Sequence, residues 1–154
     1  MCVSNENITV RILQPDEFSL AAELESLTLE EAWSAEAISE TVAANGCYVG
    51  AFQNETFLGH GGFTFAADEG YITNIAVSSA ARRKGIGTAI IQELLEKAVQ
   101  QNLSFLSLEV RESNAAAIKL YEKCGFTVRG VRPKFYKNPT ENAVIMTKDI
   151  EVSL

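Results

Sequence analysis

The chain has 154 residues, of which 47% are hydrophobic and 21% charged, and its 13 Lys and Arg against 20 Asp and Glu give a net charge of −7. This length and composition predict one globular domain over residues 1–154, with no stretch apolar enough to span a bilayer. The acidic balance disfavours a nucleic-acid partner, because a broad phosphate-binding surface needs an excess of basic residues.

The first half of the chain predicts one strand, then two helical segments, then three further strands. Residues 7–13 alternate apolar and polar side chains, which is typical of a half-buried strand. Pro15 opens a helical segment, and Ser34 opens a second one. Three strands are then predicted, at residues 47–52, 56–65 and 71–77.

The second half predicts strands and helices in alternation. Apolar residues at helical spacing indicate a helix over residues 87–101. A further helix is begun by Ser113 or Asn114 and stopped by Gly125. Strands are predicted around these helices, at residues 103–110, 126–130 and 143–150. This order indicates an α+β fold, with a mostly antiparallel twisted sheet flanked by helices.

The three cysteines do not suggest a disulfide framework or a structural zinc site. Cys2, Cys47 and Cys124 are odd in number and lack CxxC spacing, so we expect reduced thiols, two of them packed, and no metal. The N-terminal stretch has no basic region followed by an apolar run, which favours a cytoplasmic location over secretion.

A basic stretch containing two glycines stands where a strand has ended and a helix begins. It runs through Arg82, Arg83, Lys84, Gly85, Ile86, Gly87 and Thr88. The first backbone N–H groups of a helix lack partners and its dipole is positive there, so such a terminus binds anions, and glycine lets the backbone close on a phosphate. The alternative is a basic loop that only leads into a surface helix.

Two other phosphate signatures fit this stretch less well. The chain has no GxxxxGK[ST], and Ile90 stands where a dinucleotide-binding loop would have its third glycine. The sequence therefore predicts a diphosphate site that serves neither nucleotide hydrolysis nor dinucleotide binding.

Four stretches of the chain carry a family resemblance. They are NIAV at 74–77, RRKGIGT at 82–88, LEVRESNAAAIKLYEKCGF at 108–126 and NAVIM at 142–146. Together they resemble the GCN5-related N-acetyltransferases (GNAT), most closely the RimI-type ribosomal-protein-alanine acetyltransferases. The resemblance implies acetyl-CoA as the acetyl donor, with its pyrophosphate on the glycine stretch. It places the pantetheine arm beside Ile75, Ala76 and Val77, whose backbone N–H groups would also receive the acetyl oxygen.

Acetyl transfer to an amine needs a base for the nucleophile and a proton for the departing thiolate. The resemblance assigns the base to Glu109, whose alternative is an exposed strand-end carboxylate paired with Arg111. It assigns the acid to Tyr121 and a cofactor contact to Asn114. Because a phenol is a weaker acid than a thiol, we expect a hydrogen bond from Tyr121 before full proton transfer. The alternative for Tyr121 is a core aromatic.

Three aromatic residues are candidates for contact with the acceptor. Trp33, Phe135 and Tyr136 are candidate walls of a peptide groove or plain packing residues. The single histidine, His60, is expected to be a strand residue, since no Ser, His, Asp set accompanies it. Arg82 stands where the family often has Gln, which still allows a phosphate contact.

The resemblance implies an acetyl-CoA-dependent N-acetyltransferase that acts on the N-terminal α-amine of a protein such as a ribosomal protein, as a monomer or a dimer. One alternative is acetylation of a small-molecule amine or a lysine side chain. Another, of a different class, is a non-catalytic acyl-CoA sensor or interaction module.

Overall fold

The computed structural model describes residues 7–29, 32–82 and 84–150, which form seven strands and four α-helices. The strands are β1 (Ile8–Ile12), β2 (Gly46–Gln53), β3 (Thr56–Ala66), β4 (Glu69–Val77), β5 (Phe105–Arg111), β6 (Thr127–Tyr136) and β7 (Glu141–Asp149). The helices are α1 (Phe18–Thr28), α2 (Ala35–Asn45), α3 (Ile86–Gln100) and α4 (Ala115–Lys123), with short 3-10 turns η1 (Pro15–Glu17) and η2 (Ser79–Ala81). One sheet holds all seven strands in the order β1-β2-β3-β4-β5-β7-β6, and only the β4–β5 pair is parallel. The predicted α+β fold with a mostly antiparallel sheet is confirmed.

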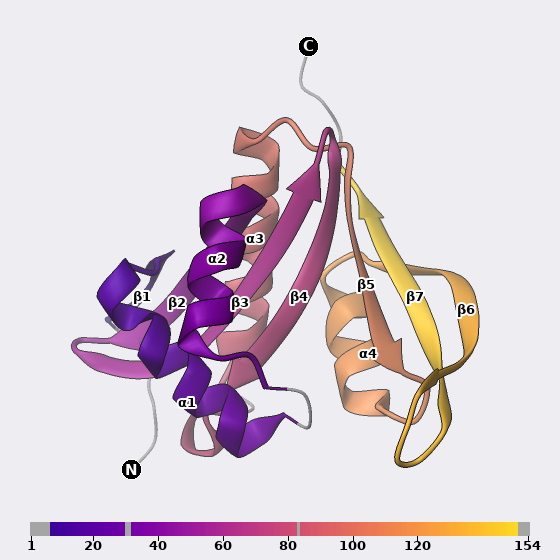
Figure 1. Cartoon of the computed structure of the whole chain (residues 1–154), viewed down its shortest axis with the longest axis horizontal. Coiled ribbons are helices and arrows are strands. Elements are labelled where there is room, and N and C mark those ends of the chain that lie inside the picture. Colours follow the sequence, from indigo (N-terminus) through magenta and orange to yellow (C-terminus); the bar gives the residue numbers. More distant parts are fainter. Residues whose placement is uncertain (1–6, 30–31, 83, 151–154) are drawn as a thin grey trace.

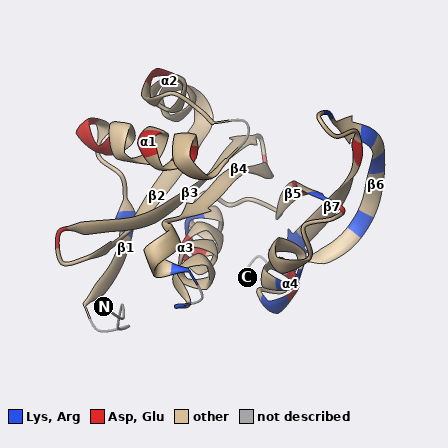
Figure 2. Cartoon of the chain, turned by 90° about the horizontal axis from the view of Figure 1, so that it is seen from below, with Lys and Arg blue, Asp and Glu red and all other residues tan. Residues whose placement is uncertain are grey.

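The helices cover the two faces of the sheet in pairs (Figures 1 and 2). Helices α1 and α2 lie on one face, where Phe18 and Ile38 pack against Tyr48 and Phe52 of β2. Helices α3 and α4 lie on the other, over the larger core that contains Leu94. Each pair of helices buries an apolar stripe against the sheet, as the helical periodicity of the sequence predicts.

The helix ends follow the predicted signals. Ser34 caps α2, since its side chain accepts a hydrogen bond from the backbone N–H of Ala37 at 3.0 Å. Of the two predicted starts for α4, Asn114 is the cap, and its side chain accepts from the backbone N–H of Ala117 at 3.2 Å. Gly125, which stops the helix, has a φ of +95°, a left-handed conformation that glycine adopts without strain.

Every strand begins and ends within two residues of its predicted bounds except at the end of β6, and the differences in β4 and β6 have a clear cause. Strand β4 begins at Glu69 rather than at residue 71, because Ala67 adopts a φ of +54° and the chain turns back earlier. Strand β6 continues to Tyr136 instead of ending at residue 130. It is an edge strand exposed on nearly every residue, so its sequence lacks the alternation of apolar and polar residues that marks a half-buried strand.

The sheet opens between β4 and β5. Their parallel pairing covers only Glu69 to Tyr71 against Phe105 to Ser107. Farther along, β4 stays paired with β3 up to Val77, whereas β5 stays paired with β7 up to Arg111. The two strands therefore diverge toward one end of the molecule, as Figure 1 shows. The opening leaves one edge of β4 without a partner strand among the described residues.

The cysteines within the described residues, Cys47 and Cys124, are free thiols and partly buried. Burial raises the pKa of Cys47 to about 11 and raises the pKa of Cys124 as well, so both stay protonated and unreactive near neutral pH. Cys2 lies outside the described residues. Within residues 7–29, 32–82 and 84–150 no group of three or more His, Cys, Asp or Glu side chains is arranged to hold a metal ion. No helix in the described part of the chain is long and apolar enough to cross a membrane.

Candidate active site

Three adjoining cavities lie along the opening between β4 and β5. The glycine-loop cavity, of about 580 Å³, lies at the start of α3; the central cavity, of about 190 Å³, lies between the diverging strands; and the aromatic cavity, of about 400 Å³, lies beyond it. Ala117 lines the first two, and Glu109 and Tyr136 line the last two. The cavities therefore form a row that leads from one face of the sheet to the other.

The glycine-loop cavity is built by the predicted phosphate-binding stretch. Gly85 is the N-cap of α3 and has a φ of +80°, so the chain turns sharply into the helix and leaves the first N–H groups free of intrahelical partners. The predicted residues that line the cavity are Val77, Arg82, Gly85, Ile86, Gly87 and Thr88. Lys84 is half-buried and outside the lining, and Arg83 lies outside the described residues. Lys123 of α4, which the sequence did not single out, adds a second cation opposite Arg82.

The central cavity brings together predicted residues from three elements. Ile75 comes from β4, Glu109 from β5, and Asn114 and Tyr121 from the start and body of α4. Ala76, between Ile75 and Val77, is only 3% exposed and turns its side chain into the core. A ligand in the opening can therefore meet Ala76 only through its backbone.

Tyr121 combines the two alternatives that the sequence left open. Its ring packs against Phe126 with 5.8 Å between ring centroids, as a core aromatic would. It also lines the central cavity. Burial, with a smaller contribution from Tyr136, raises the pKa of Tyr121 to about 12, so its hydroxyl remains a proton-bearing donor across the physiological range.

Glu109 lies where the central and aromatic cavities meet. Its Oε1 atom is 3.2 Å from Nε of Arg132 on β6, and its side chain is 29% exposed. Arg111, the partner in the alternative interpretation, lies 3.2 Å from Glu141 and over the ring of Tyr136. The carboxylate thus keeps contact with both cavities and holds one cation beside it.

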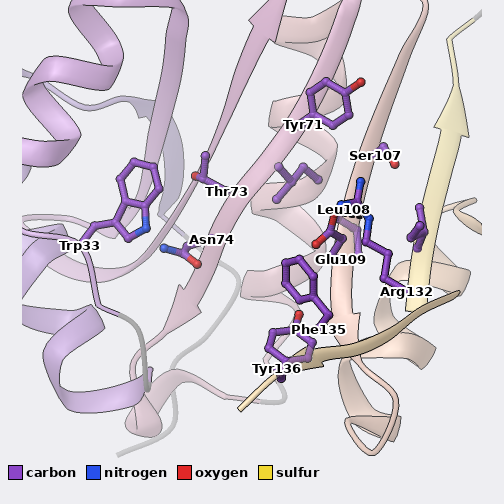
Figure 3. A pocket seen from close by; sticks show the side chains of 12 residues that line it. Trp33, Tyr71, Thr73, Asn74, Ser107, Leu108, Glu109, Arg132, Phe135 and Tyr136 are labelled. Carbon is purple, nitrogen blue, oxygen red and sulfur yellow. Dashed lines mark ion pairs between the residues drawn. The ribbon is translucent and has the colours of Figure 1, made fainter. Parts of the chain in front are cut away.

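The aromatic cavity is lined by the three residues that are candidates for binding the acetyl acceptor. Trp33 reaches it from the segment before α2, and Phe135 and Tyr136 from the end of β6, with their rings at 84° and 5.0 Å between centroids (Figure 3). Sequence reasoning missed five polar or aromatic residues of its lining, which are Tyr71, Thr73, Asn74, Ser107 and Arg132. Most of them alternate along β4 and β5, where they look like ordinary outward-facing strand residues. His60 lies in β3, as expected, and lines none of the three cavities.

Comparisons with known proteins give the family of the chain. Residues 9–126 match the acetyltransferase (GNAT) family. The chain is 30% identical over 156 residues to the N-alpha-acetyltransferase RimI of Mycobacterium tuberculosis, covering 97% of each protein. It is 39% identical over 87 residues to the ribosomal protein bS18-alanine N-acetyltransferase of Escherichia coli, which covers 55% of this chain and 59% of that protein.

The fold agrees over a longer span than the sequence matches do. The crystal structure of the ribosomal-protein-S18-alanine N-acetyltransferase from Escherichia coli superposes with a TM-score of 0.87 at 28% identity, over 96% of each chain. In sequence, the matches span only 42% and 59% of the length of the first curated relatives. The family match covers most of the described residues and includes the glycine loop, Glu109 and Tyr121. The chain belongs to the acetyltransferase (GNAT) family.

Proposed function

We propose that this chain is a cytoplasmic, acetyl-CoA-dependent N-acetyltransferase that acetylates the N-terminal α-amine of a protein, with a ribosomal protein as the first candidate acceptor. The observation that carries the proposal is the row of three cavities with Glu109 and Tyr121 at its centre. The names of the relatives support the choice of acceptor, since two of them are an N-alpha-acetyltransferase and a ribosomal protein alanine N-acetyltransferase.

The glycine-loop cavity fits the diphosphate of acetyl-CoA. The start of a helix of 15 residues, the cation of Arg82 and the cation of Lys123 all face it. Backbone N–H groups and long cationic side chains together are the usual partners of phosphate groups. The narrow central cavity suits the thin pantetheine arm, which would lie against the unpaired edge of β4.

Glu109 is the proposed base. An α-amine has an unperturbed pKa near 8, so about nine in ten are protonated at pH 7 and one proton must leave before the nitrogen attacks. A protein N-terminus entering through the aromatic cavity would meet Glu109 at its inner end. The carboxylate would take the proton directly or through one water, and the nitrogen would then attack the thioester carbon.

Tyr121 and the β4 backbone would receive the developing negative charge. When the new C–N bond has formed, the C–S bond breaks and its electron pair stays on the sulfur. Tyr121 would donate a hydrogen bond to that sulfur. The thiolate would take up the second proton, which the nitrogen releases after the C–N bond has formed, and the first proton would pass from Glu109 to solvent. Backbone N–H groups on the open edge of β4, near Ile75, would stabilise the oxygen of the tetrahedral intermediate.

Titration calorimetry with acetyl-CoA, followed by thiol release over a panel of N-terminal peptides, tests this function. We expect acetyl-CoA to bind and an N-terminal peptide to be turned over. If only polyamines, free amino acids or lysine side chains are acetylated, the proposed N-terminal acceptor is wrong and one of those amines is the substrate. Binding without turnover of any amine would favour an acyl-CoA sensor, and no binding at all would refute the proposal.

Gly87→Leu is expected to weaken acetyl-CoA binding at least about 10-fold, or about 1.4 kcal/mol. A Cβ at Gly87 would lie 3.1 Å from a methyl of Leu120, and both residues line the glycine-loop cavity, so a longer side chain would occupy the space of the cofactor. Calorimetry measures the loss, with Gly87→Ala as the matched control that adds only the Cβ. Equal affinity of the Leu variant and the wild type would place the cofactor elsewhere.

A further inference from the structure

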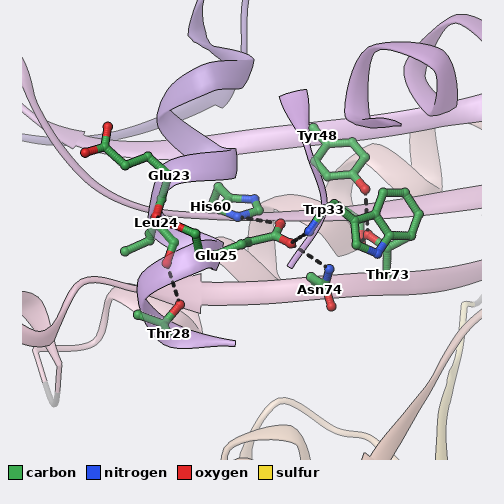
Figure 4. A network of polar contacts seen from close by, with 11 residues as sticks. Glu23, Leu24, Glu25, Thr28, Trp33, Tyr48, His60, Thr73 and Asn74 are labelled. Atoms are coloured by element: carbon green, nitrogen blue, oxygen red, sulfur yellow. Dashed lines mark hydrogen bonds and ion pairs between the residues drawn. The ribbon is translucent and has the colours of Figure 1, made fainter. Parts of the chain in front are cut away.

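A buried carboxylate outside the three cavities connects two walls of the aromatic cavity. Glu25 of α1 has no solvent exposure. Its Oε1 atom accepts a hydrogen bond from the backbone N–H of Trp33 at 2.9 Å and from Nδ2 of Asn74 at 3.0 Å (Figure 4). Trp33 and Asn74 both line the aromatic cavity, and they come from different elements.

The other oxygen of Glu25 faces a histidine that is equally buried. Oε2 of Glu25 lies 2.9 Å from Nε2 of His60, and both side chains are fully inaccessible. The His60 ring is stacked between Tyr48 and Phe57, at 6.2 and 6.4 Å between centroids. These rings fix the imidazole, and the imidazole in turn fixes the carboxylate.

A buried carboxylate is expensive to keep unless its oxygens are well partnered. Here Oε1 accepts two hydrogen bonds, both from residues of the cavity lining, whereas Oε2 has the close approach of His60 but no hydrogen bond among the described residues. Glu25 itself lines none of the three cavities, so it meets neither the reacting atoms nor the acceptor. Its contacts instead determine where the Trp33 segment stands relative to β4.

We infer that Glu25 is a positioning residue for the acceptor: by bonding Trp33 and Asn74 at once, it holds Trp33 against β4 and so sets the width of the aromatic cavity on that side. This role rests on the proposed function for its effect on turnover. Its structural part, the anchoring of Trp33, stands on the contacts alone.

Two variants of matched size separate hydrogen bonding from packing. Glu25→Gln keeps an oxygen for Trp33 and Asn74 and presents an amide N–H to His60, so the anchor is retained. Glu25→Met fills a similar volume without those bonds, so the anchor is lost. Leu94→Ala, which opens a space in the core on the opposite face of the sheet, controls for a general loss of stability.

Trp33 is the single tryptophan of the chain, so its fluorescence reports the segment directly. In Glu25→Met we expect acrylamide to quench the fluorescence of Trp33 more efficiently than in the wild type. The backbone amide of Trp33 should exchange its hydrogen about 100-fold faster. Glu25→Gln and Leu94→Ala should resemble the wild type in both measurements. With a peptide acceptor we expect Glu25→Met to raise the acceptor KM at least about 10-fold with kcat and the acetyl-CoA KM nearly unchanged.

The outcomes separate this inference from the proposed function. Wild-type fluorescence and exchange in Glu25→Met would overturn the anchoring, whether or not the protein turns over any amine. A looser Trp33 with an unchanged acceptor KM would overturn the effect on the acceptor. If Glu25→Met does not fold, hydrogen exchange in the wild type is the test. A Trp33 amide that is protected from exchange supports the anchoring, and one that exchanges at the rate of an unbonded loop amide overturns it. A wild type without turnover refutes the proposed function and leaves the exchange result valid.

Discussion

Glu109→Gln is expected to lower kcat/KM for an N-terminal peptide about 10³-fold at pH 7, because the amide cannot take the proton of the acceptor amine. The substitution keeps the size of the side chain at the junction of the two cavities. It removes the negative charge beside Arg132. Glu109 does not line the glycine-loop cavity, on which the acetyl-CoA affinity depends, so that affinity should stay close to that of the wild type.

The deficit of Glu109→Gln should shrink as the pH rises. An α-amine with a pKa near 8 is about 10% neutral at pH 7 and about 90% neutral at pH 9, so at high pH solvent has already removed the first proton from most of the amine. Rates measured from pH 6.5 to 9.5 should therefore show the variant gaining up to about 10-fold on the wild type. A deficit that is constant with pH would contradict the role of Glu109 as base.

Glu112→Gln is the matched control for this measurement. Glu112 lies three residues along the chain, is exposed, accepts a hydrogen bond from Asn142 at 3.3 Å and lines none of the three cavities. It changes the net charge by the same amount, so its rate reports the effect of charge alone. Equal losses in the two variants would show that the acidic surface, and not a proton acceptor, governs turnover.

Local signals in the sequence were sufficient for most of the elements and for the turn that lines the glycine-loop cavity. Helix caps and stops act within a few residues, so Ser34 and Gly125 could be recognised without any knowledge of the fold. The glycine stretch is a local signal too. A left-handed conformation at the start of a helix favours glycine, so Gly85 could be recognised from its residue type.

The acceptor side depends on contacts between distant parts of the chain, which local signals do not encode. Arg132 reaches Glu109 only because β6 folds back beside β7, the strand next to β5. Arg111, two residues from Glu109 in sequence, pairs with Glu141. Asn74 was recognised only as part of a family motif, and its bond to Glu25 joins residues 49 positions apart. A glutamate on a helix otherwise reads as a solvated residue, so nothing in the α1 sequence marks Glu25 as buried.

Tyr121→Phe is expected to lower kcat about 10- to 100-fold, because a hydrogen bond to a charged group contributes about 1.5–3 kcal/mol. The pKa of Tyr121, raised to about 12, decides between the two roles of the hydroxyl. Full transfer of its proton to a thiolate of pKa near 8.5 would be uphill by about 3.5 units, or about 5 kcal/mol, so donation of a hydrogen bond is the favoured role. The Phe ring still packs on Phe126, so the fold should be kept.

The pH dependence of Tyr121→Phe follows from the same pKa. A hydroxyl with a pKa of about 12 stays protonated from pH 6 to 10, so the wild type should show no loss of kcat from ionisation of Tyr121 in that range. The kcat of the variant should be lower than that of the wild type by the same factor at every pH. Tyr71→Phe, at the other end of the aromatic cavity, is the comparison, and any effect of it should fall on the acceptor KM. A wild-type kcat that falls above pH 8.5, with the fall abolished in Tyr121→Phe, would instead show a tyrosine that ionises during turnover, and a hydrogen-bonding role would then be excluded.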